Sequence, residues 1–311
     1  IHASPTCVMN MENATGYLVG EPHKGMRAMF IMMNFARLTV GVEGTALSEI
    51  AYQTAVAFCR DRRQGRSLNP ARRDDTAKAD NILVHPDVRR QLLNVRATTE
   101  GMRALGLWVA GYIDVAAHHE DADERQQADD MVALLTPIIK SYCTERGFQN
   151  VSDCMQVTGG SGYTTDWCIE QYLRDCRIAM IYEGTNHVQA LDLVGRKLPT
   201  DGGRLYKTFA KTVHKFIKSN EGEAHLAEFT GPLSKALNRL NETTMALGMK
   251  GMADPEEAAA VASNYLNLFG VTAIAYLWAR MAKAAHGQSG KFYETKFKTA
   301  QYYFTHILPE T

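Results

Sequence analysis

The stretch QVTGGSGYTTDWCIEQYLRDCRIAMIYEGTN, residues 156–186, holds the clearest structural signals in the chain. Its three closely spaced glycines are expected to end one helix and to form a loop. We expect a short helix from about Asp166 to Arg174. A further helix is expected after the YEGT segment and ends near Leu198, with Thr185 as the N-cap because threonine is a favoured capping residue. The stretch therefore predicts helices joined by glycine-containing loops.

Helical spacing of apolar residues continues upstream of this stretch. Long helices are expected from about Gly25, from Pro86 to about His118, and over roughly 124–157. Gly41, Gly44 and Ala46 in the first helix leave room for a neighbouring helix to come close. The charged segment between the first two helices is expected to be a solvated loop.

Residues 200–311 are expected to form a second helical block of roughly four helices. One of them begins at Asp254-Pro255-Glu256-Glu257, which combines a cap, an early proline and first-turn acids. The start of the chain differs, because Cys7-Val8-Met9 and Tyr17-Leu18-Val19 are strand-like and predict a hairpin or the tail of a sheet. The predicted fold is mainly α, an up-down helical bundle plus a second helical bundle, with a short β remnant at the N-terminus. The predicted domains are 1–24, 25–199 and 200–311.

Composition excludes several classes of partner. Lys plus Arg and Asp plus Glu both number 34, so the net charge is zero and gives no global attraction to nucleic acid or an anionic membrane. Six scattered cysteines without a CxxC pair argue against a zinc module or a disulfide scaffold and favour a reducing compartment. We expect no metal, because the run His118–Glu124 is expected to be a solvated loop. The apolar run 266–279 is too short for a bilayer, and no secretory leader is visible, so a cytoplasmic location is expected.

The residues themselves suggest one candidate for catalysis. GxSxG, HExxH, Walker A and GxGxxG motifs are absent from the sequence. Glu183 is the single acid in the otherwise uncharged run 178–186. A carboxylate among apolar neighbours holds a proton more readily than one in water, which suits a general base near neutral pH. A buried structural acid paired with an arginine is the alternative. The glycine loop at 159–162 leaves room for a phosphate or an adenine to approach the backbone closely. The alternative is that these glycines only end the helix.

Several motifs resemble the C-terminal half of acyl-CoA dehydrogenases in order and spacing. They are GGSGY at 159–163, Arg174-Asp175 and YEGTN at 182–186. Upstream, GYLVGEP at 16–22 is similar to the last strand of the family's middle β domain. MNFAR at 33–37 is similar to the start of its long helix.

The resemblance extends in both directions from these motifs. DRRQGR at 61–66 is similar to the family's flavin-contacting basic turn. Altogether the similarity covers about residues 8–198. The block 200–311 resembles the helical extension of the large bacterial members, including the 3-methylmercaptopropionyl-CoA dehydrogenase group. The bundle over 25–199 is accordingly expected to be of the acyl-CoA dehydrogenase C-domain type.

This resemblance implies α,β-dehydrogenation of an acyl-CoA thioester in fatty acid metabolism. The substrate's α-proton passes to a glutamate and its β-hydride to N5 of FAD, which gives the trans-2-enoyl-CoA. Glu183 occupies the position of that base. In the family, the backbone N–H of the base and a flavin ribityl hydroxyl polarise the thioester carbonyl. Some relatives place the base one residue before the arginine of the long helix, but here that residue is Ala36.

Further roles follow from the resemblance residue by residue. Arg37 would steady the base and line the acyl site, and Gly184 would contact the substrate. Asn34 stands where many relatives have an aspartate that contacts CoA. The positions that match FAD-binding residues are Arg62, Arg63, Gln64, Gln156, Gly159, Gly160, Thr185 and Asn186. Arg174 and Asp175 are expected to form a buried structural ion pair.

The implied FAD site needs more than one chain. Arg62, Arg63 and Gln64 match a turn that reaches the FAD pyrophosphate of a neighbouring subunit, and Gln156, Gly159 and Gly160 match a loop at its adenine end. A homodimer or tetramer is therefore expected, with an electron-transferring flavoprotein as acceptor. The chain lacks the family's N-terminal helical domain and most of its β domain, so alone it is expected to be inactive and to bind FAD weakly or not at all. Two alternatives stay open: a non-dehydrogenase flavoprotein that binds nucleic acid or protein, and a structural oligomerisation bundle.

Overall fold

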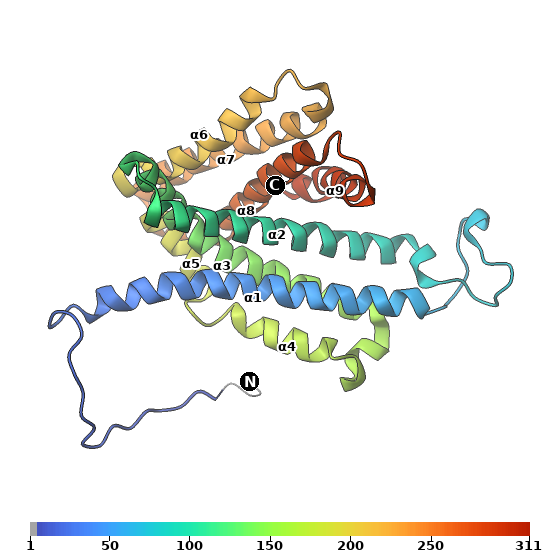
Figure 1. Cartoon of the computed structure of the whole chain (residues 1–311), viewed down its shortest axis with the longest axis horizontal. Helices are drawn as coiled ribbons and strands as arrows, with labels where there is room; N and C mark the ends of the chain where they lie inside the picture. Colours follow the sequence, from blue (N-terminus) through green and yellow to red (C-terminus); the bar gives the residue numbers. More distant parts are fainter. Residues whose placement is uncertain (1–4) are drawn as a thin grey trace.

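Three long helices form the centre of the molecule in the computed structural model, which describes residues 5–311. They are α1 (Gly25–Asp61), α2 (Pro86–His118) and α3 (Ala122–Thr158). They run up, down and up, so that α1 and α3 are parallel (Figure 1). The short helix α4 (Ile169–Ala179) packs on α1 and α3, and α5 (Asn186–Asp192) packs on α3 and α8.

The second half of the chain adds four helices on the α2 side of this layer. They are α6 (Arg204–Ser219), α7 (Ala227–Ala253), α8 (Pro255–Ala285) and α9 (Lys291–Tyr302). Two predicted N-caps are confirmed: the Thr185 hydroxyl accepts from the Val188 amide, and the Asp254 carboxylate accepts from the Glu256 amide. The mainly helical fold is therefore confirmed.

Helix α8 is the core of this second half. Trp278 is fully buried, and its Nε1 donates to the Ala97 carbonyl of α2 at 3.1 Å. By length and composition alone α8 could cross a membrane, but 61% of its most apolar window is buried inside the protein. Its apolar character is accounted for by packing against α2, α3, α5, α7 and α9.

Glycines set the close packing of α1 on α3. A Cβ on Gly41 would lie 2.4 Å from Ile139 Cγ2, and one on Gly44 would lie 2.6 Å from the Cys143 carbonyl oxygen. A Cβ on Gly147 would lie 2.5 Å from the Gly44 carbonyl oxygen. The expected close approach is confirmed at Gly41 and Gly44, and Gly147 completes it from the facing helix. It is wrong for Ala46, which is exposed and lines a cavity.

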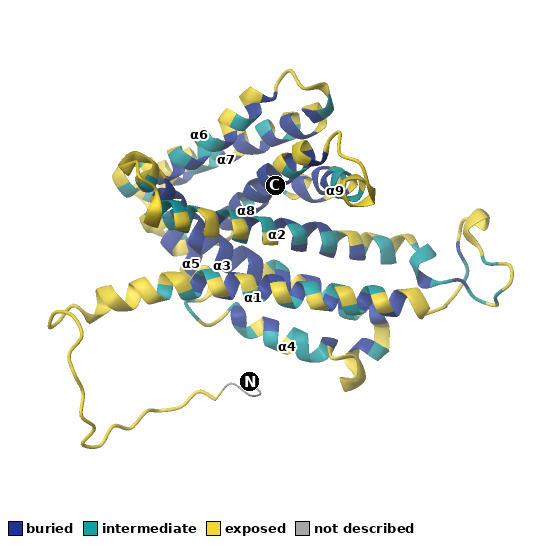
Figure 2. Cartoon of the chain, viewed as in Figure 1, coloured by how far each residue is buried: buried dark blue, intermediate teal, exposed yellow. Residues whose placement is uncertain are grey.

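The prediction of a β remnant is wrong for the described residues, since no strand occurs in 5–311. Residues 5–24 form neither helix nor strand and their side chains are exposed; Val8 is 98% and Val19 95% exposed (Figure 2). Strand-like residues form a sheet only where a partner strand takes up their backbone groups, and these two segments do not pair. Most large apolar side chains of 26–35 at the start of α1 are exposed as well.

Two local predictions also need correction. The helix expected over Asp166–Arg174 runs instead over Ile169–Ala179, because Cys168 adopts a left-handed conformation (φ 58°) that separates it from the preceding turn. Arg174 and Asp175 do not form a buried ion pair. The exposed Arg174 pairs with Glu170 at 2.9 Å, one helical turn away, and Asp175 accepts from Gln171 at 2.7 Å.

Four buried thiols predict an alkaline limit to stability. Burial raises the pKa of Cys59 to about 11 and those of Cys143 and Cys176 to about 12, and it raises that of Cys154 as well. Unfolded thiols ionise near 8.5, so above that pH the unfolded state binds fewer protons and stability falls as pH rises. Each thiol contributes up to about 1.4 kcal/mol per pH unit.

We therefore expect the free energy of unfolding, measured by urea denaturation, to fall between about pH 9 and 11. Cys143→Ala should make this fall shallower, while Cys168→Ala, at an exposed cysteine, should leave it unchanged. Equal slopes in the two variants would show that buried thiols do not cause the fall.

Candidate active site

The turn that follows α4 presents Glu183 in a strained backbone conformation. Glu183 and Gly184 are both left-handed, with φ 57° and 82°. A non-glycine residue there costs on the order of 1–3 kcal/mol and persists only where its surroundings hold it. Tyr182 contributes to this, because its hydroxyl donates to the Glu43 carboxylate of α1.

Two fully buried side chains hold the carbonyls of this turn. Gln189 Nε2 donates to the carbonyl oxygens of Glu183 and Gly184 at 3.2 and 3.3 Å. Lys140 Nζ, from α3, donates to the Gly184 carbonyl at 2.7 Å and to Asn186 Oδ1 at 3.0 Å. Gly184 has no room for a side chain, since a Cβ there would lie 2.6 Å from Gln189 Nε2.

Arg37 of α1 lies against the same turn. It is buried, its Nη1 is 3.8 Å from Asp192 Oδ2, and its Nη2 would be 3.8 Å from a Cβ on Gly184. Within residues 5–311, Arg37 Nε, Glu183 Oε2 and Gln189 Oε1 are buried without a hydrogen-bond partner. Unpartnered buried polar groups are rare and costly. Three such atoms lie in or beside this one turn.

Lys140 is the residue of this site whose pKa is shifted. Burial, followed by the nearby charge of Arg37, lowers its pKa to about 8, while Glu183, Glu145 and Glu43 act in the opposite direction. Sequence analysis missed Lys140 and Gln189. A signal for the lysine was present, because it is the only charged residue in the run 131–144.

Asn186, predicted to contact the cofactor, has its side chain engaged within the protein. Its Oδ1 accepts from Lys140 and Thr144, and its Nδ2 donates to the Glu145 carboxylate at 3.0 Å. The Thr185 hydroxyl serves as the α5 cap. Asn34 is exposed on α1, one helical turn before Arg37.

The basic turn 61–66 contains three arginines, of which Arg62 and Arg63 were predicted to bind FAD and Arg66 donates to the Asp74 and Ala77 carbonyls. Arg63 Nη1 donates to Asp74 Oδ2 at 2.7 Å and to the Ala79 carbonyl, so its guanidinium is held within its own loop. Hydrogen bonds from Thr76 and Arg63 lower the pKa of Asp74 to about 2. Arg62 is exposed, and its one side-chain contact in the described chain is to Gln64 Oε1 at 3.3 Å. Arg62 is therefore the arginine left available for an anion.

The glycine loop lies far from Glu183. Gln156, Gly159 and Gly160 are exposed where α3 ends. The backbone of Gly159 (φ 61°, ψ −149°) adopts a conformation that glycine reaches easily and residues with a side chain rarely adopt. Gln156 follows Lys140 by 16 residues, or about 24 Å along α3. The predicted residues thus form two groups: Arg37 lies beside the turn of Glu183 and Gly184, and Gln156, Gly159 and Gly160 lie at the C-terminal end of α3.

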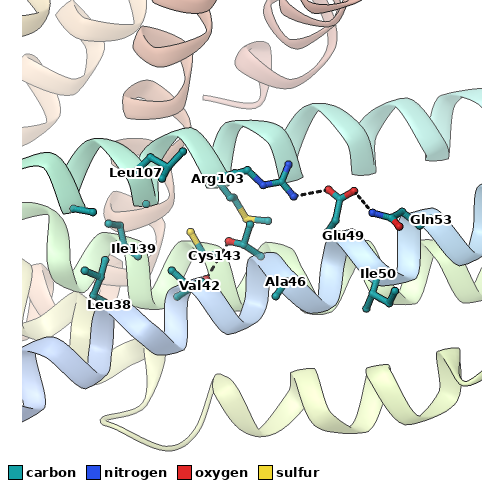
Figure 3. Close-up of a pocket in the computed structure, with 15 residues that line it drawn as sticks. Leu38, Val42, Ala46, Glu49, Ile50, Gln53, Arg103, Leu107, Ile139 and Cys143 are labelled. Atoms are coloured by element: carbon teal, nitrogen blue, oxygen red, sulfur yellow. Dashed lines mark hydrogen bonds and ion pairs between the residues drawn. The ribbon is translucent and has the colours of Figure 1, made fainter. Parts of the chain in front are cut away.

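A separate apolar cavity of about 430 Å³ opens between α1, α2 and α3 (Figure 3). It runs along Leu38, Val42 and Leu107 to an ion pair between Glu49 and Arg103 at 2.7 Å. It is lined by none of the predicted site residues. The cavity therefore lies apart from the Glu183 turn.

Comparison with known proteins identifies the class. The family described as "Acyl-CoA dehydrogenase, C-terminal domain" matches residues 67–198, and "Acetyl-CoA dehydrogenase C-terminal like" matches residues 209–311. The chain belongs to the acyl-CoA dehydrogenase family and carries its C-terminal domains.

Two curated relatives span the chain almost completely. It is 40% identical to the 3-methylmercaptopropionyl-CoA dehydrogenase of Ruegeria pomeroyi over 100% of this chain and 53% of that protein. It is 32% identical to the broad-specificity linear acyl-CoA dehydrogenase FadE5 of Mycobacterium tuberculosis over 95% of this chain and 51% of that protein. The chain thus spans about half the length of these relatives.

A solved structure shows the same fold. The crystal structure of an acyl-CoA dehydrogenase complexed with FAD from Bacillus anthracis superposes with a TM-score of 0.74. The identity is 19%, and the match covers 94% of this chain and 49% of that chain. The helical arrangement of both halves of the chain is therefore that of a known acyl-CoA dehydrogenase structure.

Proposed function

We propose that the protein containing this chain oxidises an acyl-CoA thioester to the trans-2-enoyl-CoA, with Glu183 as the base that takes the α-proton. The observation that carries the proposal is the buried, unpartnered Oε2 of Glu183 on a strained turn. A carboxylate oxygen without a partner is free to accept a proton from a bound substrate. Arg37, with its own unpartnered Nε, lies beside the turn to orient the carboxylate and line the acyl site.

The residues present fit FAD, which the family resemblance implies. Arg62 offers an uncommitted guanidinium that suits a diphosphate, and the exposed glycines of 159–160 leave room for an adenine. When bound, FAD supplies the hydride acceptor for the substrate's β-carbon. The chain's own part is to bind the thioester, to orient Glu183 and to hold the abstracted proton on its carboxylate.

The wider assignment also follows the family. We propose a cytoplasmic flavoprotein of fatty acid metabolism that works as a homodimer or tetramer, with an electron-transferring flavoprotein as acceptor. The offset of about 24 Å along α3 between Lys140, which contacts the Glu183 turn, and Gln156 supports a cofactor shared between subunits. Residues 25–199 form the catalytic helical domain in this proposal, and 200–311 form an extension that packs on it through α8.

The test is an anaerobic titration of the full-length protein, with FAD bound, against a panel of acyl-CoAs. The panel contains 3-methylmercaptopropionyl-CoA and straight-chain acyl-CoAs, as the names of the two relatives suggest. Bleaching of the flavin absorbance by one class supports the proposal and names the substrate. A bound flavin that no acyl-CoA bleaches contradicts it and returns the protein to the binding or structural alternatives.

Arg62 and Arg63 of the basic turn should differ on substitution. Arg62→Ala is expected to weaken FAD binding about tenfold or more, the usual effect of losing a charged hydrogen bond, with little change in melting temperature. Arg63→Ala is expected to act mainly on its own loop, because it removes the Asp74 and Ala79 contacts. Isothermal titration with FAD separates the two. A larger affinity loss in Arg63→Ala would reverse the assignment.

A further inference from the structure

The Glu183 turn depends on two side chains that the proposed reaction does not use directly. Lys140 and Gln189, together called the clamp, are both 0% exposed and donate three hydrogen bonds to the carbonyls of Glu183 and Gly184. We propose that the clamp fixes this left-handed turn in the conformation that presents the Glu183 carboxylate to the substrate. Both members are positioning residues, and the proposal rests on the proposed function of Glu183.

A fully buried lysine costs free energy of folding, and this cost argues for a specific role. Burying an ammonium loses its hydration, and an apolar side chain of similar volume would pack in the same space at lower cost. Met131, Leu134 and Ile138 on the same stretch of α3 are apolar core residues. The ammonium instead makes a charge-assisted hydrogen bond of 2.7 Å to the Gly184 carbonyl, the stronger kind of donor contact.

Gln189 closes the turn from the other side. Its position in the first turns of α5 lets one amide nitrogen reach both carbonyls, while Oε1 stays buried and unpartnered within the described chain. A Cβ on Gly184 would collide with this nitrogen. The left-handed backbone, the absence of a side chain at 184 and the two donors therefore form one arrangement.

The charge of Lys140 is set by groups from each packed element. Burial and Arg37 of α1 lower its pKa, while Glu183 of the turn, Glu145 of α3 and Glu43 of α1 raise it, with a result of about 8. Above that pH the lysine loses its charge and donates weaker hydrogen bonds. The hydrogen bond from Lys140 to the Gly184 carbonyl should therefore weaken as pH rises through about 8.

The test uses the full-length protein with Lys140→Met and Gln189→Met, which keep side-chain length and remove the donors. Matched controls are Lys296→Met, whose ammonium bonds Glu100, and Gln91→Met, another glutamine with a buried unpartnered Oε1. We expect kcat to fall at least tenfold in the clamp variants with KM within about threefold, since a buried carbonyl loses its donor. The controls should keep both constants.

Amide hydrogen exchange of residues 181–189, measured without substrate, is the second readout. The clamp variants should exchange faster in this segment while α8 keeps its protection. Faster exchange throughout the chain would show a merely structural role and overturn the proposal, as would unchanged exchange in 181–189. Wild-type kcat should fall above about pH 8, and a profile flat through that pH would also count against the clamp. If no acyl-CoA is oxidised by wild type, the proposed function fails, while the exchange measurement still decides the clamp.

Discussion

Glu183→Gln in the full-length protein is expected to lower the rate of flavin reduction by a saturating acyl-CoA about 10²–10⁴-fold, the usual contribution of a general base. Glutamine keeps the shape of the side chain but cannot accept the α-proton. FAD binding should be retained, because the Gln189 and Lys140 contacts go to backbone carbonyls that the substitution leaves in place. Anaerobic stopped-flow measurement of the flavin absorbance gives both quantities.

A matched control comes from the apolar cavity between α1, α2 and α3. Glu49 is a partly buried glutamate of α1 that pairs with Arg103 and lines the apolar cavity of Figure 3. Glu49→Gln should leave the rate of flavin reduction within about threefold of wild type, because it lies outside the site. If the two variants lose activity equally, a general loss of carboxylates explains the effect and Glu183 is not the base.

Gly147→Ala is expected to destabilise the protein by about 1–3 kcal/mol, since the new Cβ would lie 2.5 Å from the Gly44 carbonyl oxygen. A backbone atom cannot move aside as a flexible side chain can, so α1 and α3 must separate. Arg37 precedes Gly44 by seven residues and Lys140 precedes Gly147 by seven, which is about two turns in each helix. Separation should therefore also displace Arg37 from the Glu183 turn and lower kcat.

Gly111→Ala on α2 is the control for this effect. A Cβ there meets nothing within 4 Å, and alanine is the better helix former, so stability should rise by about 0.5–1 kcal/mol. Urea denaturation of both variants gives the free energies of unfolding. A neutral or stabilising Gly147→Ala would mean that the glycine contact does not set the distance between α1 and α3.

Sequence reasoning found the features that are local. The α2 start near Pro86 and the caps at Thr185 and Asp254 depend on neighbouring positions, and each is confirmed. Strand propensity in 7–9 and 17–19 was misleading, because a strand also requires a partner that the described residues do not provide.

Features that depend on distant residues were out of reach. Whether Arg62 or Arg63 is free to bind an anion depends on Asp74, which lies eleven residues after Arg63. The fold of the loop brings Arg63 and Asp74 together. The contact of Lys140 with Gly184 joins residues 44 positions apart, through the packing of the turn against α3. The signal for Lys140 was its isolation as a charge in an apolar run, which predicts a special role but not its partner.

The central claim, that Glu183 takes the α-proton, is tested most directly by hydrogen exchange at the substrate itself. Full-length wild type and Glu183→Gln, both loaded with FAD, are incubated anaerobically in D₂O with the acyl-CoA that bleaches the flavin. Mass spectrometry then measures deuterium at the α-carbon of the recovered thioester. We expect wild type to introduce deuterium and Glu183→Gln to introduce none above the rate without enzyme. Incorporation at a comparable rate in both would show that another group removes the proton.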